Sequence, residues 1–221
     1  MSETDLEISV RDQTLVLMHE RAAFWREAGI LLVADPHFGK AASFRASGIP
    51  VPSGTTDEGL SRLTAIVSRT NPKLIVFLGD LLHAREGRST GMLSALAEWR
   101  RENTQIDLML VRGNHDRRAG DPPGELGMSC VDAPFLSSPF VLAHHPVQNE
   151  NGYVIAGHVH PGVRLYGTGR QRERLPCFVF GESTAVMPAF GDFTGLADAD
   201  PDSSARIYAI ADTAVIEVAQ N

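Results

Sequence analysis

Five polar clusters, each placed directly after an apolar run, constrain this 221-residue chain more than any other feature. The first four runs have the length of buried strands and occupy residues 30–33, 74–78, 106–111 and 140–143, while the fifth, at 154–156, is shorter. A loop that leaves a buried strand is rigid at its root and free at its tip, so ligands and chemistry collect there in α/β proteins. The pattern therefore predicts an α/β fold with one site at these strand ends.

Length and composition limit the class of protein. A chain with 43% hydrophobic residues can bury one large core, and we expect a single domain over residues 1–221. The formal charge of -7 argues against a surface built throughout for nucleic acid, although it leaves local binding open. The first residues are acidic, unlike a signal peptide, and no apolar run approaches the roughly 18 residues of a membrane span. With only two distant cysteines, Cys130 and Cys177, we expect a cytoplasmic protein without a membrane segment.

The order of the elements predicts two packed sheets. Residues 6–10, 14–18 and 22–25 are short β-prone runs that begin an antiparallel sheet. From residue 30 to 111, strands alternate with helical patterns, one capped by Thr55 or Thr56 and one by Ser89 or Thr90, as is typical of a parallel sheet. Short strands follow at about 139–143, 153–156, 163–166, 176–180, 206–210 and 213–218. We therefore expect an α/β fold, a four-layer αββα sandwich of two mixed β-sheets flanked by helices.

The clusters differ in how specifically each one indicates a metal site. Asp35-x-His37 and the strand-end Asp80 are weak alone, since a turn aspartate or a cap explains them as well. Gly113-Asn114-His115-Asp116 is sharper, because an amide oxygen coordinates a cation without adding charge and the adjacent histidine can approach a leaving group. If locally extended, His158 and His160 would point to the same side. Six of the eight histidines lie in the clusters, and His19 and His83 lie outside them, whereas ordinary core histidines would be scattered.

In order and residue type, the five clusters resemble the signature of the calcineurin-like metallophosphoesterases, whose fold is also a double-sheet αββα sandwich. The resemblance implies two divalent metal ions, one held by Asp35, His37 and His160, the other by Asn114, His144 and His158, with Asp80 bridging them. His115 would be the acid near the leaving oxygen, in a catalytic set with Asp80 and Asn114. The resemblance favours His144, because the family's ligand commonly stands two residues before a proline, as His144 stands before Pro146; His145 is the alternative.

The chemistry that these residues imply is phosphodiester hydrolysis by a metal-activated bridging hydroxide. Imidazole, carboxylate and amide ligands suit Mn or Fe better than Ca or Mg, with Zn as a further alternative. Lys40, Arg45, Arg117 and Arg118 lie within a few residues of proposed ligands and are candidate contacts to the substrate's phosphates. Ordinary surface arginines are an equal alternative for these positions.

Further stretches are similar to the bacterial ligase-associated DNA damage response phosphoesterases, which are also found beside Lhr-type helicases. The similarity covers roughly residues 15–195, with its clearest stretches at 35–40, 79–83, 143–146, 157–161, 175–178 and 187–191. It implies a manganese-dependent DNA endonuclease in DNA repair, with single-stranded DNA as the expected substrate and an Lhr-type helicase and a DNA ligase as functional partners. The alternatives are a phosphodiesterase for a small nucleotide or other small phosphodiester and, more remotely, a non-catalytic scaffold on the same fold.

Overall fold

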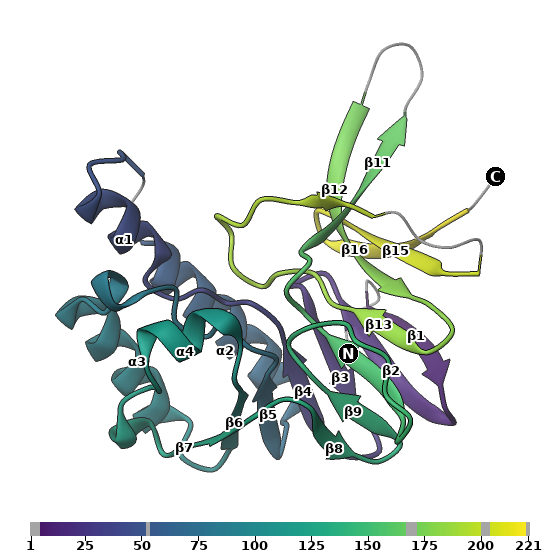
Figure 1. The fold of residues 1–221 in the computed structure, drawn as a ribbon, viewed down its shortest axis with the longest axis horizontal. Coiled ribbons are helices and arrows are strands. Elements are labelled where there is room, and N and C mark those ends of the chain that lie inside the picture. The colour runs from purple at the N-terminus through teal and green to yellow at the C-terminus, as the bar shows by residue number, and fades with distance from the viewer. Residues whose placement is uncertain (1–4, 52–53, 167–171, 200–203, 220–221) are drawn as a thin grey trace.

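Two β-sheets pack against each other, and helices cover the outer face of the first sheet (Figure 1). This computed structural model describes residues 5–51, 54–166, 172–199 and 204–219. Both sheets contain parallel and antiparallel pairs, which confirms the expected pair of mixed sheets flanked by helices. No helix in these described ranges is long and apolar enough to cross a membrane.

The first sheet begins antiparallel and continues parallel, in the order β1-β2-β3-β4-β5-β6-β7. Its strands are β1 (Leu6–Val10), β2 (Gln13–Met18), β3 (Ala22–Trp25), β4 (Ile30–Val33), β5 (Leu74–Phe77), β6 (Asp107–Val111) and β7 (Met128–Val131). Every residue of β4 is buried, as its uninterrupted apolar sequence requires. Because β4, β5 and β6 are parallel neighbours, their carboxyl ends lie at one edge of the sheet.

Four α-helices lie between residues 40 and 119 of the described chain, and the last three contribute side chains to the core on the outer face of this sheet. They are α1 (Lys40–Ala46), α2 (Thr55–Thr70), α3 (Thr90–Glu102) and α4 (Asn114–Ala119), with single 3₁₀ turns η1 (Arg85–Gly87) and η2 (Gly124–Leu126). Leu63 of α2 and Trp99 of α3 lie in one core cluster with Ile75 of β5, and burying a side chain of this size contributes about 1.5–3 kcal/mol.

One of the two predicted helix caps is confirmed. The Ser89 hydroxyl accepts the N–H of Met92 at 3.3 Å and caps α3. The predicted cap of α2 at Thr55 or Thr56 is wrong, since both threonines already lie in the first turn and Gly54 occupies the cap position. Its φ of 97° is a left-handed conformation that glycine adopts without strain.

The second sheet is built from the second half of the chain, in the order β14-β11-β12-β13-β10-β9-β8, with β15 and β16 continuing from β12. Its strands are β8 (Phe135–Ser137), β9 (Phe140–Leu142), β10 (Tyr153–Ala156), β11 (Pro161–Tyr166), β12 (Arg172–Phe180), β13 (Thr184–Val186), β14 (Ala197–Asp198), β15 (Arg206–Ala211) and β16 (Ala214–Val218). Strands β9 and β10 are parallel, so their carboxyl ends also share an edge.

A large core between the sheets joins the two halves. Leu32 and Val76 of the first sheet lie in the same cluster as Phe178 and Tyr208 of the second. Trp25 meets Phe140 edge to face, with ring centroids 4.8 Å apart. This packing brings the carboxyl ends of β4, β5 and β6 against those of β9 and β10.

Candidate metal centre

The loops after β4, β5, β6, β9 and β10 place the predicted ligands in one continuous cluster. Three groups of donor atoms lie within 4.8 Å of one another: Asp35, His37 and His160; Asp35, Asp80 and His144; and His144, His145 and His158. Asn114, the first residue of α4, joins them because its Oδ1 lies 2.9 Å from Nε2 of His144. The structure therefore brings all seven predicted ligands together.

Backbone strain is concentrated in the same residues. The φ angles of Asp35, His37, Asp80, His158 and His160 are 51°, 47°, 51°, 69° and 52°, in the left-handed region that side chains with a Cβ rarely adopt. Strain of this kind persists where the surrounding structure imposes it, and it gathers at functional sites. The backbone at His158 and His160 is left-handed and not extended, so the predicted route to a shared side does not apply. Even so, His158 joins His144 and His160 joins Asp35 and His37, which are the two groups that the resemblance implies.

Three glycines leave room for the ligands. A Cβ on Gly79 would lie 2.2 Å from Nδ1 of His144, and Gly79 also has a φ of 83°. A Cβ on Gly157 would lie 2.4 Å from Oδ2 of Asp35, and one on Gly113 would lie 2.3 Å from Oδ1 of Asp80. Only glycine allows the backbone to approach a ligand side chain this closely.

Backbone N–H groups hold the two buried carboxylates. The N–H of His158 donates to Oδ2 of Asp35 at 2.7 Å, and the N–H of His115 donates to Oδ1 of Asp80 at 2.9 Å. Burial raises the pKa of the Asp80 carboxyl, because its ionised form lacks solvent. A cation beside Asp80 would favour the ionised form.

Asp116 stabilises the backbone that carries Asp80 and Asn114. Its buried carboxylate accepts the N–H groups of Asp80 and Gly113 at 2.7 and 2.8 Å, so it ties the loop after β5 to the start of α4. Burial raises the pKa of Asp116 as well. Asp116 was part of a predicted cluster, but its supporting role was not predicted, because it depends on contacts across 36 residues.

The geometry distinguishes His144 from His145. His144 is fully buried, and its Nδ1 donates to the carbonyl oxygen of Leu78 at 3.0 Å, which leaves Nε2 as the coordinating nitrogen. That Nε2 lies 3.0 Å from Nδ1 of His158 and 3.5 Å from Oδ1 of Asp80. The side chain of His145 is exposed, and its ring lies against that of His158 with centroids 4.0 Å apart. His144 is therefore the better placed of the two as a ligand.

The cluster contains buried polar atoms that a cation would satisfy. Oδ1 of Asp35 and Nε2 of His160 are buried 3.7 Å apart, and neither has a hydrogen-bond partner among the described residues. An unsatisfied buried polar group costs about 1–3 kcal/mol. A divalent cation between them would bind both lone pairs, and the mixed imidazole, carboxylate and amide donors suit a first-row transition metal.

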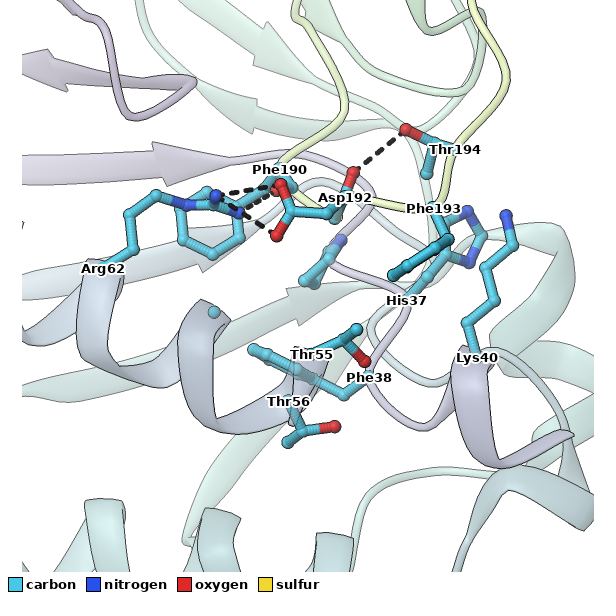
Figure 2. Close-up of a pocket in the computed structure, with 13 residues that line it drawn as sticks. His37, Phe38, Lys40, Thr55, Thr56, Arg62, Phe190, Asp192, Phe193 and Thr194 are labelled. Carbon is cyan, nitrogen blue, oxygen red and sulfur yellow. Dashed lines mark hydrogen bonds and ion pairs between the residues drawn. The ribbon is translucent and has the colours of Figure 1, made fainter. Parts of the chain in front are cut away.

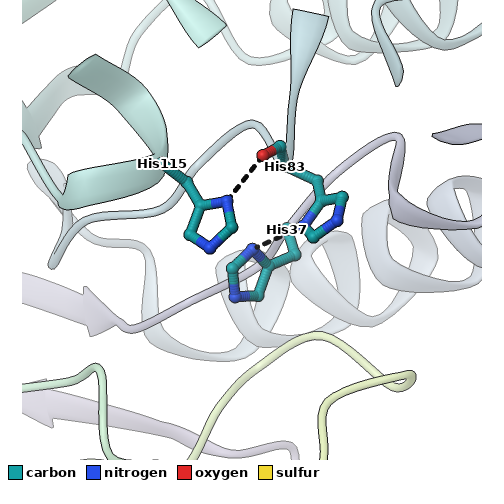
Figure 3. A group of neighbouring side chains, drawn as sticks. All are labelled: His37, His83 and His115. Carbon is teal, nitrogen blue, oxygen red and sulfur yellow. Dashed lines mark hydrogen bonds between the residues drawn. The ribbon is translucent and has the colours of Figure 1, made fainter. Parts of the chain in front are cut away.

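His37, His83 and His115 form a further group of neighbouring side chains beside the predicted ligands (Figure 3). Burial, with smaller effects from Lys40 and neighbouring histidines, lowers the pKa of His37 to about 2, so its imidazole is neutral as a metal ligand requires. His115 donates from Nδ1 to the carbonyl oxygen of His83 at 2.7 Å, which leaves Nε2 facing Asp80 at 3.9 Å.

His83 is the functional-site residue that sequence reasoning left outside the clusters. Its ring stacks on that of His115 with centroids 5.0 Å apart, and its Nδ1 lies 3.5 Å from Nδ1 of His37. Burial lowers its pKa to about 4. The available signal was its position in Gly79-Asp-Leu-Leu-His83, since the bridge between Phe38 and Leu82 aligns this segment with the loop that carries His37.

A small hollow separates His37 from the first turn of α2 (Figure 2). Lys40 runs beside His37 and Phe193, and burial lowers its pKa against the attraction of Asp80 and Asp35. Arg62 pairs with Asp192 at 3.0 Å and stacks on Phe190 at 4.4 Å, which fixes residues 190–194 next to this hollow.

The four predicted substrate contacts do not gather on one surface. Lys40 borders the hollow beside His37, whereas Arg117 lines a cavity beside Asn114 and His145. Arg45 is exposed, and its guanidinium donates to the carbonyl of Val51 at 3.5 Å. Arg118 is also exposed, and its carbonyl accepts the Nε–H of Arg85. Lys40 and Arg117 are thus the two that border the centre's own pockets.

Comparison with known proteins agrees with this geometry. The family model described as calcineurin-like phosphoesterase matches residues 28–140, which contain the first three clusters but not His144, His158 or His160. The crystal structure of the nuclease MPE from Pseudomonas putida is similar at 39% identity and a TM-score of 0.85, over 96% of this chain and 100% of that one. Yfce, a phosphoesterase from E. coli, aligns at 16% identity and a TM-score of 0.41, over 87% and 99% of the two chains. No curated protein matches the chain.

Proposed function

The chain belongs to the calcineurin-like phosphoesterase family, and on that premise we propose that it is a binuclear-metal phosphodiesterase acting as a DNA endonuclease. The observation that carries the proposal is the pair of donor groups on either side of Asp80. Asp35, His37 and His160 form one group, and Asn114, His144 and His158 form the other. Asp80 lies between them, 3.8 Å from His37 Nε2 and 3.5 Å from His144 Nε2.

These residues have separate tasks. The first group would hold one divalent cation and the second group the other, and both groups would share the Asp80 carboxylate. When bound, two such cations lower the pKa of a water between them and neutralise charge that develops on the phosphate. Mn²⁺ is the proposed metal, with Fe and Zn as alternatives that the same donors accept.

His115 is placed to hold a proton for the leaving oxygen. Because a carbonyl oxygen only accepts, the contact to His83 fixes the proton of Nδ1 and turns Nε2 toward the centre. A protonated Nε2 can then donate to the oxygen that departs from phosphorus. Asp116 fixes the position of His115 relative to Asp80, because its carboxylate accepts the N–H groups of Asp80 and Gly113.

DNA is the proposed substrate, and three observations support it. The similar protein from Pseudomonas putida is named a nuclease. Lys40 and Arg117 lie beside the centre, where cations can contact phosphates that flank the cut. Asn114 and His145 border an open cavity rather than a closed chamber, which suits an extended strand better than a small nucleotide.

The proposed cellular setting rests on the similarity to the ligase-associated DNA damage response phosphoesterases. We propose a role in DNA repair, in functional association with an Lhr-type helicase and a DNA ligase, on single-stranded DNA. Cys130 and Cys177 are both free thiols, which supports the cytoplasm as the proposed compartment.

Cleavage of circular single-stranded DNA tests the proposal, because a circle has no ends and only an endonuclease can open it. Chelator-treated protein is assayed with Mn²⁺ restored, beside a small aryl phosphodiester and an Asn114→Ala variant. We expect the wild type to open the circle and the variant to fail on both substrates. Hydrolysis of the small diester alone would replace DNA by a small phosphodiester as substrate. If neither substrate is cut, the catalytic proposal is wrong and the alternative of a non-catalytic scaffold is favoured.

A further inference from the structure

A cavity of about 420 Å³ adjoins the centre between α4 and the segments that flank β8 and β9. Asn114 and His145 line it, and so do Arg112 and Arg117. Ala133, Pro134, Ala143 and Val147 supply apolar walls. The volume falls within the range of about 300–1,000 Å³ that is usual for small-ligand sites.

The cavity is continuous with the centre. Asn114 lines the cavity while its Oδ1 contacts His144 at 2.9 Å. His145 lines it from the other side, with its ring 4.0 Å from that of His158. A chain whose phosphate lies at the centre therefore places its neighbouring group in the cavity or across its mouth.

The chemistry of the walls selects that neighbouring group. Val147 is 56% exposed, so the cavity leaves apolar surface uncovered. The side chain of Arg117 is 64% exposed, and its contact with Asp132, itself 72% exposed, is long at 3.7 Å. Such a pair is weak in water, so the guanidinium can contact a phosphate instead. Arg112 also lines the cavity, but its guanidinium donates to the Asp121 carboxylate at 2.7 and 2.8 Å. Apolar walls beside the more weakly held guanidinium of Arg117 match a nucleobase followed by a phosphate.

We propose that this cavity is a subsite for one unpaired nucleobase next to the scissile phosphate, with Arg117 at the phosphate beyond it. The inference rests on the proposed phosphodiesterase function and goes further by naming what the enzyme selects. A base in a duplex is stacked on both faces and paired at its edge, so only an unpaired base enters such a cavity. Selection for single strands then follows from the cavity's shape.

Dinucleotides test the subsite without changing charge. The substrates are thymidylyl-thymidine and its two analogues that each lack one base, all with a single phosphodiester. For the wild type with Mn²⁺, we expect one analogue to have a kcat/KM about fivefold or more below that of the intact dinucleotide, in line with the contribution of a single base. In Val147→Glu, which places a carboxylate in the apolar wall, this ratio should fall toward one.

Leu136→Glu is the matched control, because Leu136 is 55% exposed on β8 and does not line the cavity. It should keep the wild-type ratio. Equal rates for all three substrates in the wild type, or a ratio that survives Val147→Glu, would overturn the subsite while leaving the phosphodiesterase intact. No hydrolysis of any substrate, together with uncut circular DNA, would instead remove the function on which the subsite rests.

Arg117→Ala gives a second, independent readout on a single-stranded oligonucleotide. Loss of one phosphate contact should reduce the slope of log affinity against log salt by about 0.7. An unchanged slope would overturn the assignment of Arg117.

Discussion

The edges of the two sheets contribute different ligands and hold them by opposite means. The loops after β4 and β5 supply the carboxylates, Asp35 and Asp80, which are 0% and 2% exposed and accept backbone N–H groups. The loops after β9 and β10 supply imidazoles, and buried His144 donates its spare N–H to a carbonyl. A buried carboxylate needs donors, whereas a coordinating imidazole needs its second nitrogen occupied elsewhere.

These supports cross from one sheet to the other. His158, after β10, provides the N–H that holds Asp35, and Leu78, after β5, provides the carbonyl that orients His144. The glycine contacts cross in the same way, since Gly79 makes room for His144 and Gly157 makes room for Asp35. Neither edge can present its ligands correctly without the other.

The largest effect should follow from Asp80→Asn, because Asp80 is the carboxylate shared by both edges. Loss of an outer-shell partner costs about 10–100-fold, so loss of this ligand should lower Mn²⁺-dependent hydrolysis by more than about a hundredfold. Asparagine keeps an oxygen for the N–H of His115 and removes a buried charge whose pKa is already raised. The metal-free variant should therefore melt no lower than the wild type. Activity within tenfold of wild type would show that Asp80 is not a ligand of the centre. Asp107→Asn is the neutral control, because Asp107 is exposed at the start of β6, away from the carboxyl end of that strand.

Substitution of the crossing glycines should have the next largest effect. Gly79→Ala and Gly157→Ala each push a Cβ into a ligand held by the other sheet, so hydrolysis should fall about 10–100-fold. In α3, Gly91→Ala has open space and should raise the free energy of unfolding by about 0.5–1 kcal/mol. Normal activity in both crossing variants would show that the sheets do not support each other's ligands.

A pH series isolates the imidazole on the first edge. The folded pKa of His37 is about 2, far below its ordinary value of 6.5, so the unfolded chain binds more protons between these values. The contribution of neutral His37 to the free energy of unfolding is therefore complete above about pH 6.5 and is lost as the pH falls. From pH 6.5 to 5.5, metal-free wild type should lose about 1 kcal/mol more than His37→Asn, measured by denaturant unfolding. Parallel losses in the two proteins would contradict the burial of a neutral His37.

The smallest effect should come from Arg45, which lies on neither edge. Its exposed guanidinium contacts Val51, so Arg45→Ala should lower cleavage of single-stranded DNA by less than about threefold. Cleavage rates of the variant and the wild type, compared at two salt concentrations, measure this loss. A loss above tenfold would mean that the DNA path runs over α1, which the geometry of the pockets does not favour.

The sequence predicted the first edge more completely than the second. Strands β4 and β5 are uninterrupted apolar runs, and β6 is apolar after Asp107. Polar residues at their ends could be placed together because parallel strands share an edge. Strand β7, Met128–Val131, was missed because its mixed sequence is only partly buried, and β13 because it has three residues. The positions of His158 and His160 depend on left-handed backbone and on contacts across more than 100 residues, which no local pattern contains.

Titration of chelator-treated protein with Mn²⁺ in a calorimeter tests the two-metal centre most directly. Wild type should bind two ions per chain, and Asn114→Ala should bind one, because the group of Asp35, His37 and His160 is left intact. A stoichiometry of one or none for the wild type would contradict a centre built from both sheets.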